Sequence, residues 1–181
     1  MNRFITCVLV FACSLLTMGL PEAHSQVMAA KPLRFDFTVT KKRLDVERVD
    51  KGSTNITEEK WAYEVAIRNS TFVDQGGLTI EYRNYRQQDS GKHTGARSKL
   101  PLIAHPGTEK IEALTKSGIY KFTTKAVEIK KSELKANWFY SDGTKDKVKD
   151  TLFGIWLRVL KDGEIVSEYF HPASLKSKTE W

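Results

Sequence analysis

Apolar and polar residues alternate with a period of two in several stretches of this chain. Residues 33–40 alternate leucine, phenylalanine and valine with charged and hydroxyl side chains, and residues 61–68 and 78–83 repeat the pattern with aromatic and β-branched side chains. Because the side chains of a strand point alternately to opposite faces, this period predicts half-buried β-strands. Turn residues at 51–55 and 76–77 separate the three predicted strands.

The pattern is less regular in the middle of the chain. Residues 44–49 resume the alternation after a charged interruption, so the first strand is expected to be long and bent. Residues 111–114 and 119–129 predict two further strands, the second richer in aromatic and β-branched positions. Residues 130–137 fit either one helical turn or a crossing loop.

The clearest local signal is a β-hairpin over residues 152–170. Asp162 and Gly163 separate two apolar runs, and an Asp-Gly pair accepts the positive φ angles of a type I′ turn. Both faces of residues 152–160 are largely apolar, which indicates a strand in the middle of a sheet. Pro172 ends the partner strand, because proline cannot donate to a ladder.

These elements predict an all-β fold, an antiparallel β-sandwich of immunoglobulin or fibronectin type III kind with about seven strands and no disulfide. The predicted domain spans residues 33–172, and residues 173–181 form a polar tail. Trp61 and Trp156 are expected to join the two sheets, since a buried aromatic side chain removes a large apolar area from water. The predicted core consists of Phe35, Phe37, Trp61, Tyr63, Ile67, Ile80, Phe122, Ile155, Trp156 and Leu157.

Four segments carry a resemblance to a known class of domain. They are Trp61-Ala62-Tyr63-Glu64-Val65, Ile67-Arg68-Asn69, Gly77-Leu78-Thr79-Ile80-Glu81-Tyr82-Arg83 and Gly154-Ile155-Trp156-Leu157-Arg158-Val159. In this combination the chain resembles secreted bacterial immunoglobulin-like domains, including ones associated with pilus or envelope assembly. The resemblance covers most of the chain after residue 25. It implies a noncatalytic surface or periplasmic module and assigns no binding residue.

The N-terminal segment predicts export. Arg3 precedes an apolar run over residues 4–20, and Ala23-His24-Ser25 supplies the small residues that a signal peptidase needs for cleavage after Ser25. We therefore interpret residues 1–25 as a cleaved signal peptide and residues 26–32 as an N-terminal linker. An uncleaved membrane anchor and cleavage a few residues later are the alternatives.

Cysteine and charge content narrow the chemistry of the mature protein. Cys7 and Cys13 lie within the predicted signal peptide, so the mature domain is expected to have no disulfide and no Cys-ligated metal, and lipidation of Cys13 stays an open alternative. The 181 residues include 29 Lys and Arg against 22 Asp and Glu, a formal net charge of +7. In an exported protein the polyanions that this balance favours as partners are lipid headgroups, acidic polysaccharide or acidic proteins rather than nucleic acid, and a solvated surface that only keeps the protein in solution is the alternative. No long apolar run follows residue 25, so we expect no transmembrane segment in the mature chain.

Catalytic motifs with diagnostic spacing do not occur in the sequence. There is no Gly-x-Ser-x-Gly elbow, no His-Glu-x-x-His pair and no phosphate-binding glycine loop. Asp142 and Asp162 each precede a glycine, where turn formation explains a carboxylate. We therefore expect no enzyme, no cofactor and no metal site.

The run Trp138-Phe139-Tyr140 is the most distinctive aromatic group. Successive residues of a strand face opposite sides, so at least one of the three is expected to pack inward. The binding hypothesis places Trp138 and Tyr140 on a sugar ring, with Lys145 and Lys147 binding its acidic groups.

Two functional hypotheses follow. The first is an exported noncatalytic β-sandwich that acts through protein contacts, self-association included, in the bacterial envelope or on the cell surface, in adhesion or appendage assembly. Its contact surface would be a sheet edge, by addition of a β-strand, or a loop surface. The second is a polysaccharide-binding module that uses exposed aromatic side chains and lysines. Periplasm, outer surface and medium are equally compatible with the sequence.

Overall fold

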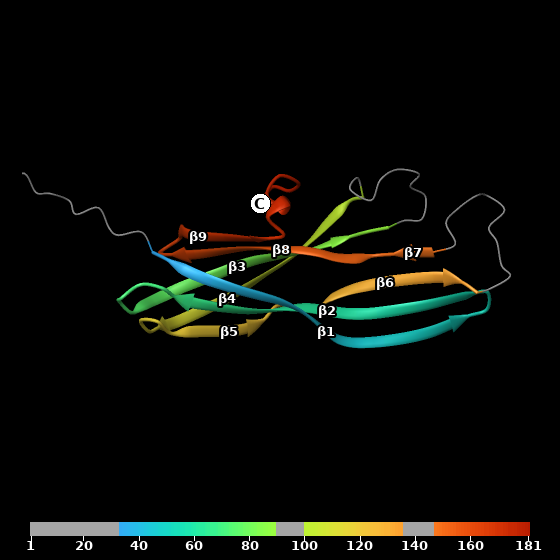
Figure 1. The fold of residues 1–181 in the computed structure, drawn as a ribbon, viewed down its shortest axis with the longest axis horizontal. Helices are drawn as coiled ribbons and strands as arrows, with labels where there is room; N and C mark the ends of the chain where they lie inside the picture. The colour runs from blue at the N-terminus through green and yellow to red at the C-terminus, as the bar shows by residue number, and fades with distance from the viewer. Residues whose placement is uncertain (1–32, 90–99, 136–146) are drawn as a thin grey trace, which may run out of the picture. The chain divides into compact units, whose positions relative to one another are not determined.

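Two antiparallel β-sheets make up the fold of the described residues, which are 33–89, 100–135 and 147–181 of the computed structural model (Figure 1). The predicted signal peptide and linker, residues 1–32, lie outside these ranges. The described part of the chain contains nine strands, and it has no helix long and apolar enough to span a membrane.

The first sheet, sheet A, is built around one long strand. This strand, β2 (Thr54–Asn69), pairs along one edge with the equally long β1 (Phe35–Lys51). Along its other edge it pairs first with β6 (Val127–Leu134) and then with β5 (Ile119–Thr123). A short strand, β7 (Lys147–Lys149), extends the sheet beyond β6.

The second sheet, sheet B, has the order β4-β3-β8-β9. Its central strands are β3 (Gln75–Gln87) and β8 (Thr151–Lys161), and its edges are β4 (Leu102–Leu114) and β9 (Glu164–His171). The sheet order β1-β2-β6 and β3-β8-β9 corresponds to strands A-B-E and C-F-G of an immunoglobulin-type sandwich. The predicted fold class is therefore confirmed.

The strand count differs from the predicted seven because one predicted strand is divided. Residues 119–129 form β5 and β6, with Thr124 between them. The Thr124 amide donates to the Tyr63 carbonyl at 2.9 Å, and its hydroxyl accepts the Tyr63 amide at 2.9 Å. These bonds hold the break against the middle of β2. Residues 130–134 continue β6 as a strand, and β7 adds the ninth.

The core lies between the inner faces of the sheets. Of the residues predicted for it, Tyr63, Ile67, Ile80, Ile155 and Leu157 are completely buried, and Phe35 is nearly so. Three others, Phe37, Trp61 and Phe122, are half-buried and pack against the margin of this cluster. These three residues lie at the margin of the core for two reasons. β1 is an edge strand, and each sheet extends beyond the area that the other sheet covers.

Trp156 takes a different place from the one expected. The alternation along β8 directs Ile155 and Leu157 into the core, so Trp156 is on the outer face of sheet B, in a second cluster with Tyr85 and Leu175. The C-terminal segment, with its short 3₁₀ helix at Ala173–Leu175, covers this cluster. Residues 173–181, expected to be a polar tail, thus contribute a completely buried leucine.

One of the two turns predicted from glycine residues lies where the sequence placed it, and the other does not. The β8–β9 hairpin is confirmed, with Asp162 at φ 52° and Gly163 at φ 85°. The glycine pair at 76–77 belongs to strand β3, and the turn that precedes β3 is formed by residues 70–74 instead. Gly77 has a φ of 64° and interrupts the pairing of β3 with β4, which accounts for a glycine within a strand.

Candidate functional site

The predicted sugar-binding ledge is only partly described. Trp138, Tyr140 and Lys145 lie outside the described residues. Lys147 is on β7, where its ammonium donates to Glu133 at 2.9 Å. The structure therefore places Lys147 in an exposed ion pair with a neighbouring strand.

The most exposed apolar side chains lie on two connections at one end of the sandwich. Phe72 is 86% exposed and Val73 is 60% exposed, both in the β2–β3 connection. Ile119 is 56% exposed and begins β5, directly after the β4–β5 connection. Figure 1 shows both connections at the same end of the molecule. We refer to Phe72, Val73 and Ile119 as the apolar tip.

A buried asparagine fixes the backbone that carries the apolar tip. Asn69 ends β2 and is completely buried. Its side-chain amide donates to the carbonyl oxygens of Val73 at 2.9 Å, Thr115 at 3.1 Å and Leu114 at 3.3 Å. Its side-chain oxygen accepts the Thr71 amide at 3.0 Å and the Thr71 hydroxyl at 2.6 Å. One side chain therefore holds both connections, and its hydrogen-bonding capacity is used in full.

Two further bonds join the same connections. The Asn69 amide donates to the Gly118 carbonyl at 2.9 Å, and the Lys116 amide donates to the Asp74 carboxylate at 2.7 Å. Each connection is thus tied to the other at more than one point. These bonds support the loop conformation in which Phe72 and Val73 are exposed.

Charges of both signs surround the apolar tip. Arg68 lies opposite Ile119 on β2, and Asp36 lies opposite Arg68 on β1. Lys116 and Asp74 are exposed on the two connections themselves. Because these charges are of both signs, the electrostatic potential around the apolar tip is neither uniformly positive nor uniformly negative.

A second concentration of functional groups lies where the inner face of sheet A becomes charged. Along β2 the inward positions run from Ile67 through Tyr63 and Trp61 to Glu59. A cleft of about 190 Å³ opens there, between sheet A and the start of β8. We call it the Lys41 cleft; its lining consists of Lys41, Glu59, Trp61, Ile129, Lys131, Lys149, Asp150, Thr151 and Leu152.

Glu59 is the buried anion of the Lys41 cleft, at 5% exposed. It accepts the Lys131 ammonium at 2.5 Å and the Trp61 indole N–H at 2.7 Å, and Arg43 approaches to 4.0 Å. Burial by itself raises the pKa of Glu59, but the bonds from Lys131 and Trp61 outweigh it and hold that pKa below its ordinary value. Glu59 is therefore ionised at neutral pH, and its carboxylate oxygens are bound by Lys131 and Trp61.

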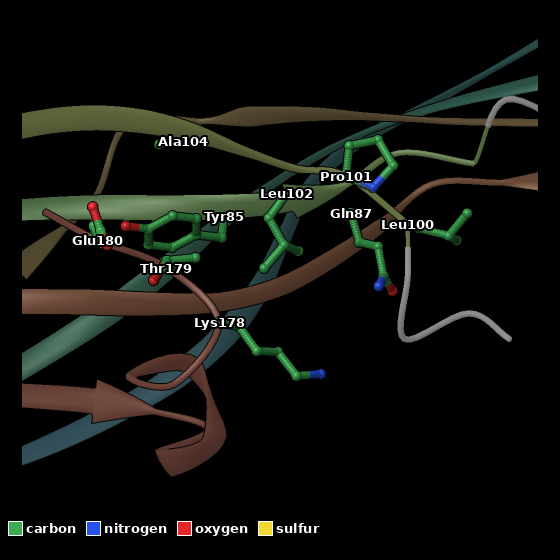
Figure 2. Close-up of a pocket in the computed structure, with 9 residues that line it drawn as sticks. All are labelled: Tyr85, Gln87, Leu100, Pro101, Leu102, Ala104, Lys178, Thr179 and Glu180. Carbon is green, nitrogen blue, oxygen red and sulfur yellow. The ribbon is translucent and has the colours of Figure 1, made fainter.

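Another hollow lies between the C-terminal segment and strands β3 and β4 (Figure 2). Its volume is about 520 Å³, and Tyr85, Leu102 and Pro101 form much of its apolar wall. Lys178 and Glu180 supply the charged groups at its rim. The Tyr85 hydroxyl is buried beside it without a hydrogen-bond partner among the described residues.

The described residues contain no group of three His, Cys, Asp or Glu side chains that could hold a metal ion. His105, on β4, is half-buried, and burial together with Arg86 lowers its pKa. His171 is exposed at the end of β9, before a cis peptide bond to Pro172.

No protein-family model matches the chain, and no curated protein matches it. A Bordetella pertussis structure, provisionally described as ApaA, is 12% identical over 77% of this chain and 94% of its own, with a TM-score of 0.34. A structural-genomics target is 10% identical over 75% and 84% of the two chains, with a TM-score of 0.34. A structure from Akkermansia muciniphila is 12% identical over 82% and 78%, with a TM-score of 0.28. At such scores we take neither family nor function from these structures.

Sequence reasoning missed the apolar tip and the Lys41 cleft. An apolar pair between turn residues, as in Thr71-Phe72-Val73-Asp74, was the available signal for the tip. Asn69 looked like an ordinary strand end. The cleft joins residues from β1, β2, β6 and β8, and only the tertiary structure brings these together.

Proposed function

We propose that the chain is an exported, noncatalytic β-sandwich that binds another protein through its apolar tip. The tip would insert Phe72, Val73 and Ile119 into an apolar surface of the partner in the envelope or on the cell surface. Adhesion and appendage assembly are the processes in which we expect such a contact. The observation that carries the proposal is the exposure of Phe72 on a loop held by the completely buried Asn69.

A rigid loop favours binding because its ordering cost is met during folding. An unconstrained loop loses conformational freedom when it binds, and that loss weakens the complex. Aromatic side chains are enriched among the residues that dominate binding energy at interfaces. Phe72 combines both properties, since an aromatic side chain is presented on a connection to which the Asn69 side chain makes three hydrogen bonds.

The edge strands β1 and β4 are less suited to contact by addition of a strand. The free edge of β1 carries Lys41, Lys42 and Arg43, followed by a register shift before Asp45. The edge strand β4 contains Pro106, which cannot donate to a ladder. Charged side chains, bulges and proline are the devices that keep edges from pairing. We therefore favour the loop surface over strand addition.

A membrane surface is also less suited to the tip. Anionic lipid attracts clustered basic residues next to apolar side chains. Asp36 and Asp74 accompany Arg68 and Lys116 around the tip, so the basic residues there are offset. A protein partner with its own mixed charges fits this surface better.

The experiment starts with crosslinking of the protein in its own cells and identification of the captured partner by mass spectrometry. The affinity of the purified pair is then measured for the wild type, for the double variant Phe72→Ser, Val73→Ser, and for the control Leu44→Ser, Val46→Ser. The control removes exposed apolar side chains of β1, which are 47% and 43% exposed. We expect the tip variant to bind at least about tenfold more weakly, a loss of about 1.4 kcal/mol.

Equal affinities for the tip variant and the wild type would refute the proposal. The proposal would also be refuted if the wild type and the tip variant both captured the partner and the β1 control did not. Binding of the purified protein to anionic vesicles, abolished in the tip variant, would assign the tip to a membrane instead.

A further inference from the structure

The Lys41 cleft contains cationic groups that lack a carboxylate partner. Glu59 is already shared by Lys131 and Arg43. The other carboxylate of the lining, Asp150, accepts the Asp89 amide at 2.9 Å and lies 3.6 Å from Arg86. Within the described ranges, no carboxylate then remains for Lys41 or for Lys149.

Lys41 is directed into the cleft with unused donors. Its ammonium donates to the Leu152 carbonyl at 2.7 Å, across from β1 to β8. An ammonium has three N–H donors, and this bond uses one of them. Partial burial lowers the pKa of Lys41, which means that its charge is incompletely solvated. An anion at this point would supply the missing stabilisation.

Lys149 adds a second cation to the lining, with no carboxylate partner in the part of the chain that the structure describes. It lies directly across from Lys131 in the antiparallel pairing of β6 and β7. Like charges at directly opposite positions destabilise a sheet. Glu59 offsets the charge of Lys131 but, within the described residues, leaves that of Lys149 without a carboxylate, so a bound anion would find a cation there.

Trp61 supplies a fixed aromatic wall. It is half-exposed, and the bond from its indole N–H to Glu59 fixes the orientation of the ring. Ile129 and Leu152 complete the apolar part of the lining. Apolar surface next to ammonium groups suits a ligand with a C–H face and an anionic substituent, which is the chemistry of an acidic sugar.

The size of the cleft limits the ligand to one acidic group at a time. Its volume of about 190 Å³ is below the range of about 300–1,000 Å³ typical of sites that enclose a whole drug-sized ligand.

We propose that the Lys41 cleft binds the carboxylate or sulfate group of an acidic sugar. Lys41 and Lys149 hold the anionic oxygens, and Trp61 packs against the sugar ring. Lys131 stays paired with Glu59 and leaves the anion to Lys41 and Lys149. The site is separate from the apolar tip, so either proposal can fail without the other.

The test is a titration of the purified protein with oligogalacturonate, a carboxylated sugar chain, at low salt. The variants are Lys41→Met, Lys149→Met and the control Lys110→Met, which removes the same charge from an exposed position of β4. We expect Lys41→Met and Lys149→Met each to weaken binding about tenfold, the effect of one charge-assisted hydrogen bond. We expect Lys110→Met to bind as the wild type does, and the Trp61 indole N–H resonance to shift on titration. A sulfated dextran fragment would distinguish sulfate from carboxylate as the preferred group.

Three results would overturn the proposal. The first is equal binding of a neutral oligosaccharide of the same length. The second is equal weakening by Lys110→Met, which would show that only net charge matters. The third is tighter binding of an oligoglutamate peptide with the same dependence on Lys149, which would assign the cleft to an acidic protein. Lys149 is exposed on a short strand, so its variant remains informative if Lys41→Met fails to fold.

Discussion

The indole ring of Trp181 meets that of Trp156 edge-on, with ring centroids 5.1 Å apart and an interplanar angle of 77°. Arg158 lies over both rings, 4.0 Å from the centroid of Trp181 and 4.8 Å from that of Trp156. Arg83 approaches Trp181 to 4.6 Å. The C-terminal segment is therefore anchored on the outer face of sheet B by alternating aromatic and guanidinium groups.

This anchor predicts that Trp181→Ala lowers the free energy of unfolding by about 2 kcal/mol, because one aromatic pair and two cation–π contacts are lost together. Urea denaturation followed by circular dichroism measures the change. Ser177→Ala, in the same segment but outside the ring cluster, is the control and should change stability little. Equal stability of Trp181→Ala and the wild type would show that the segment packs without contributing.

Asn69 is expected to be the most sensitive polar position of the domain. Asn69→Ala removes five side-chain hydrogen bonds from a completely buried position, including the one that the Thr71 amide makes, and we expect a loss of about 3 kcal/mol in the free energy of unfolding. Hydrogen exchange at the Thr71 amide should accelerate at the same time. The exposed Asn55→Ala is the matched control. Unchanged protection of Thr71 in Asn69→Ala would contradict the rigid presentation of the tip.

Glu59 predicts a pH-dependent contribution to stability. Its pKa is lower in the folded than in the unfolded chain, so its stabilisation is complete above the ordinary glutamate pKa and is lost as the pH falls through the folded pKa. Glu59→Gln should therefore be less stable than the wild type by about 2 kcal/mol at pH 7. The difference should disappear in strongly acidic solution, where both side chains are neutral. Chemical denaturation across this pH range measures it, and a difference that stays constant with pH would refute the assignment.

Gly107 predicts a steric effect at the edge of the core. A Cβ atom at this position would lie 2.2 Å from the ring of the buried Tyr82, its partner across β3 and β4. The Tyr82 hydroxyl accepts the Lys125 amide at 3.0 Å, so the ring cannot move without loss of that bond. Gly107→Ala should cost about 2 kcal/mol, the usual effect of overpacking. A thermal unfolding midpoint equal to that of the wild type would contradict the packing of Tyr82 over Gly107.

Local sequence signals predicted those parts of the fold that depend on neighbouring residues. The Asp162-Gly163 turn follows from the φ angles that these residues tolerate, and the alternation over 61–68 follows from one buried sheet face. The apolar run Ile155-Trp156-Leu157 does not by itself show which face of β8 meets the other sheet, although the charged Arg158 on the same face as Trp156 favours the outer side. That choice depends on the C-terminal segment, which covers Trp156 through Leu175 and Trp181.

Both binding surfaces depend on contacts between residues far apart in the sequence. Asn69 acts on Leu114 and Thr115, more than forty residues away. Lys41 reaches Leu152 across 111 positions. A period of two identifies a strand but not its partner, so neither relationship could be read from local pattern. Phe72 is exposed on the connection whose residues Thr71 and Val73 are bound by Asn69.

The most direct measurement of the central claim is site-specific photo-crosslinking from position 72 in living cells. A photoreactive phenylalanine analogue replaces Phe72 in one variant and Lys110 in the control. We predict one dominant adduct with a defined protein from position 72, absent from position 110 and lost when Asn69→Ala is added. The same adducts from both positions, or none from position 72, would contradict the assignment of the tip as a protein-binding surface.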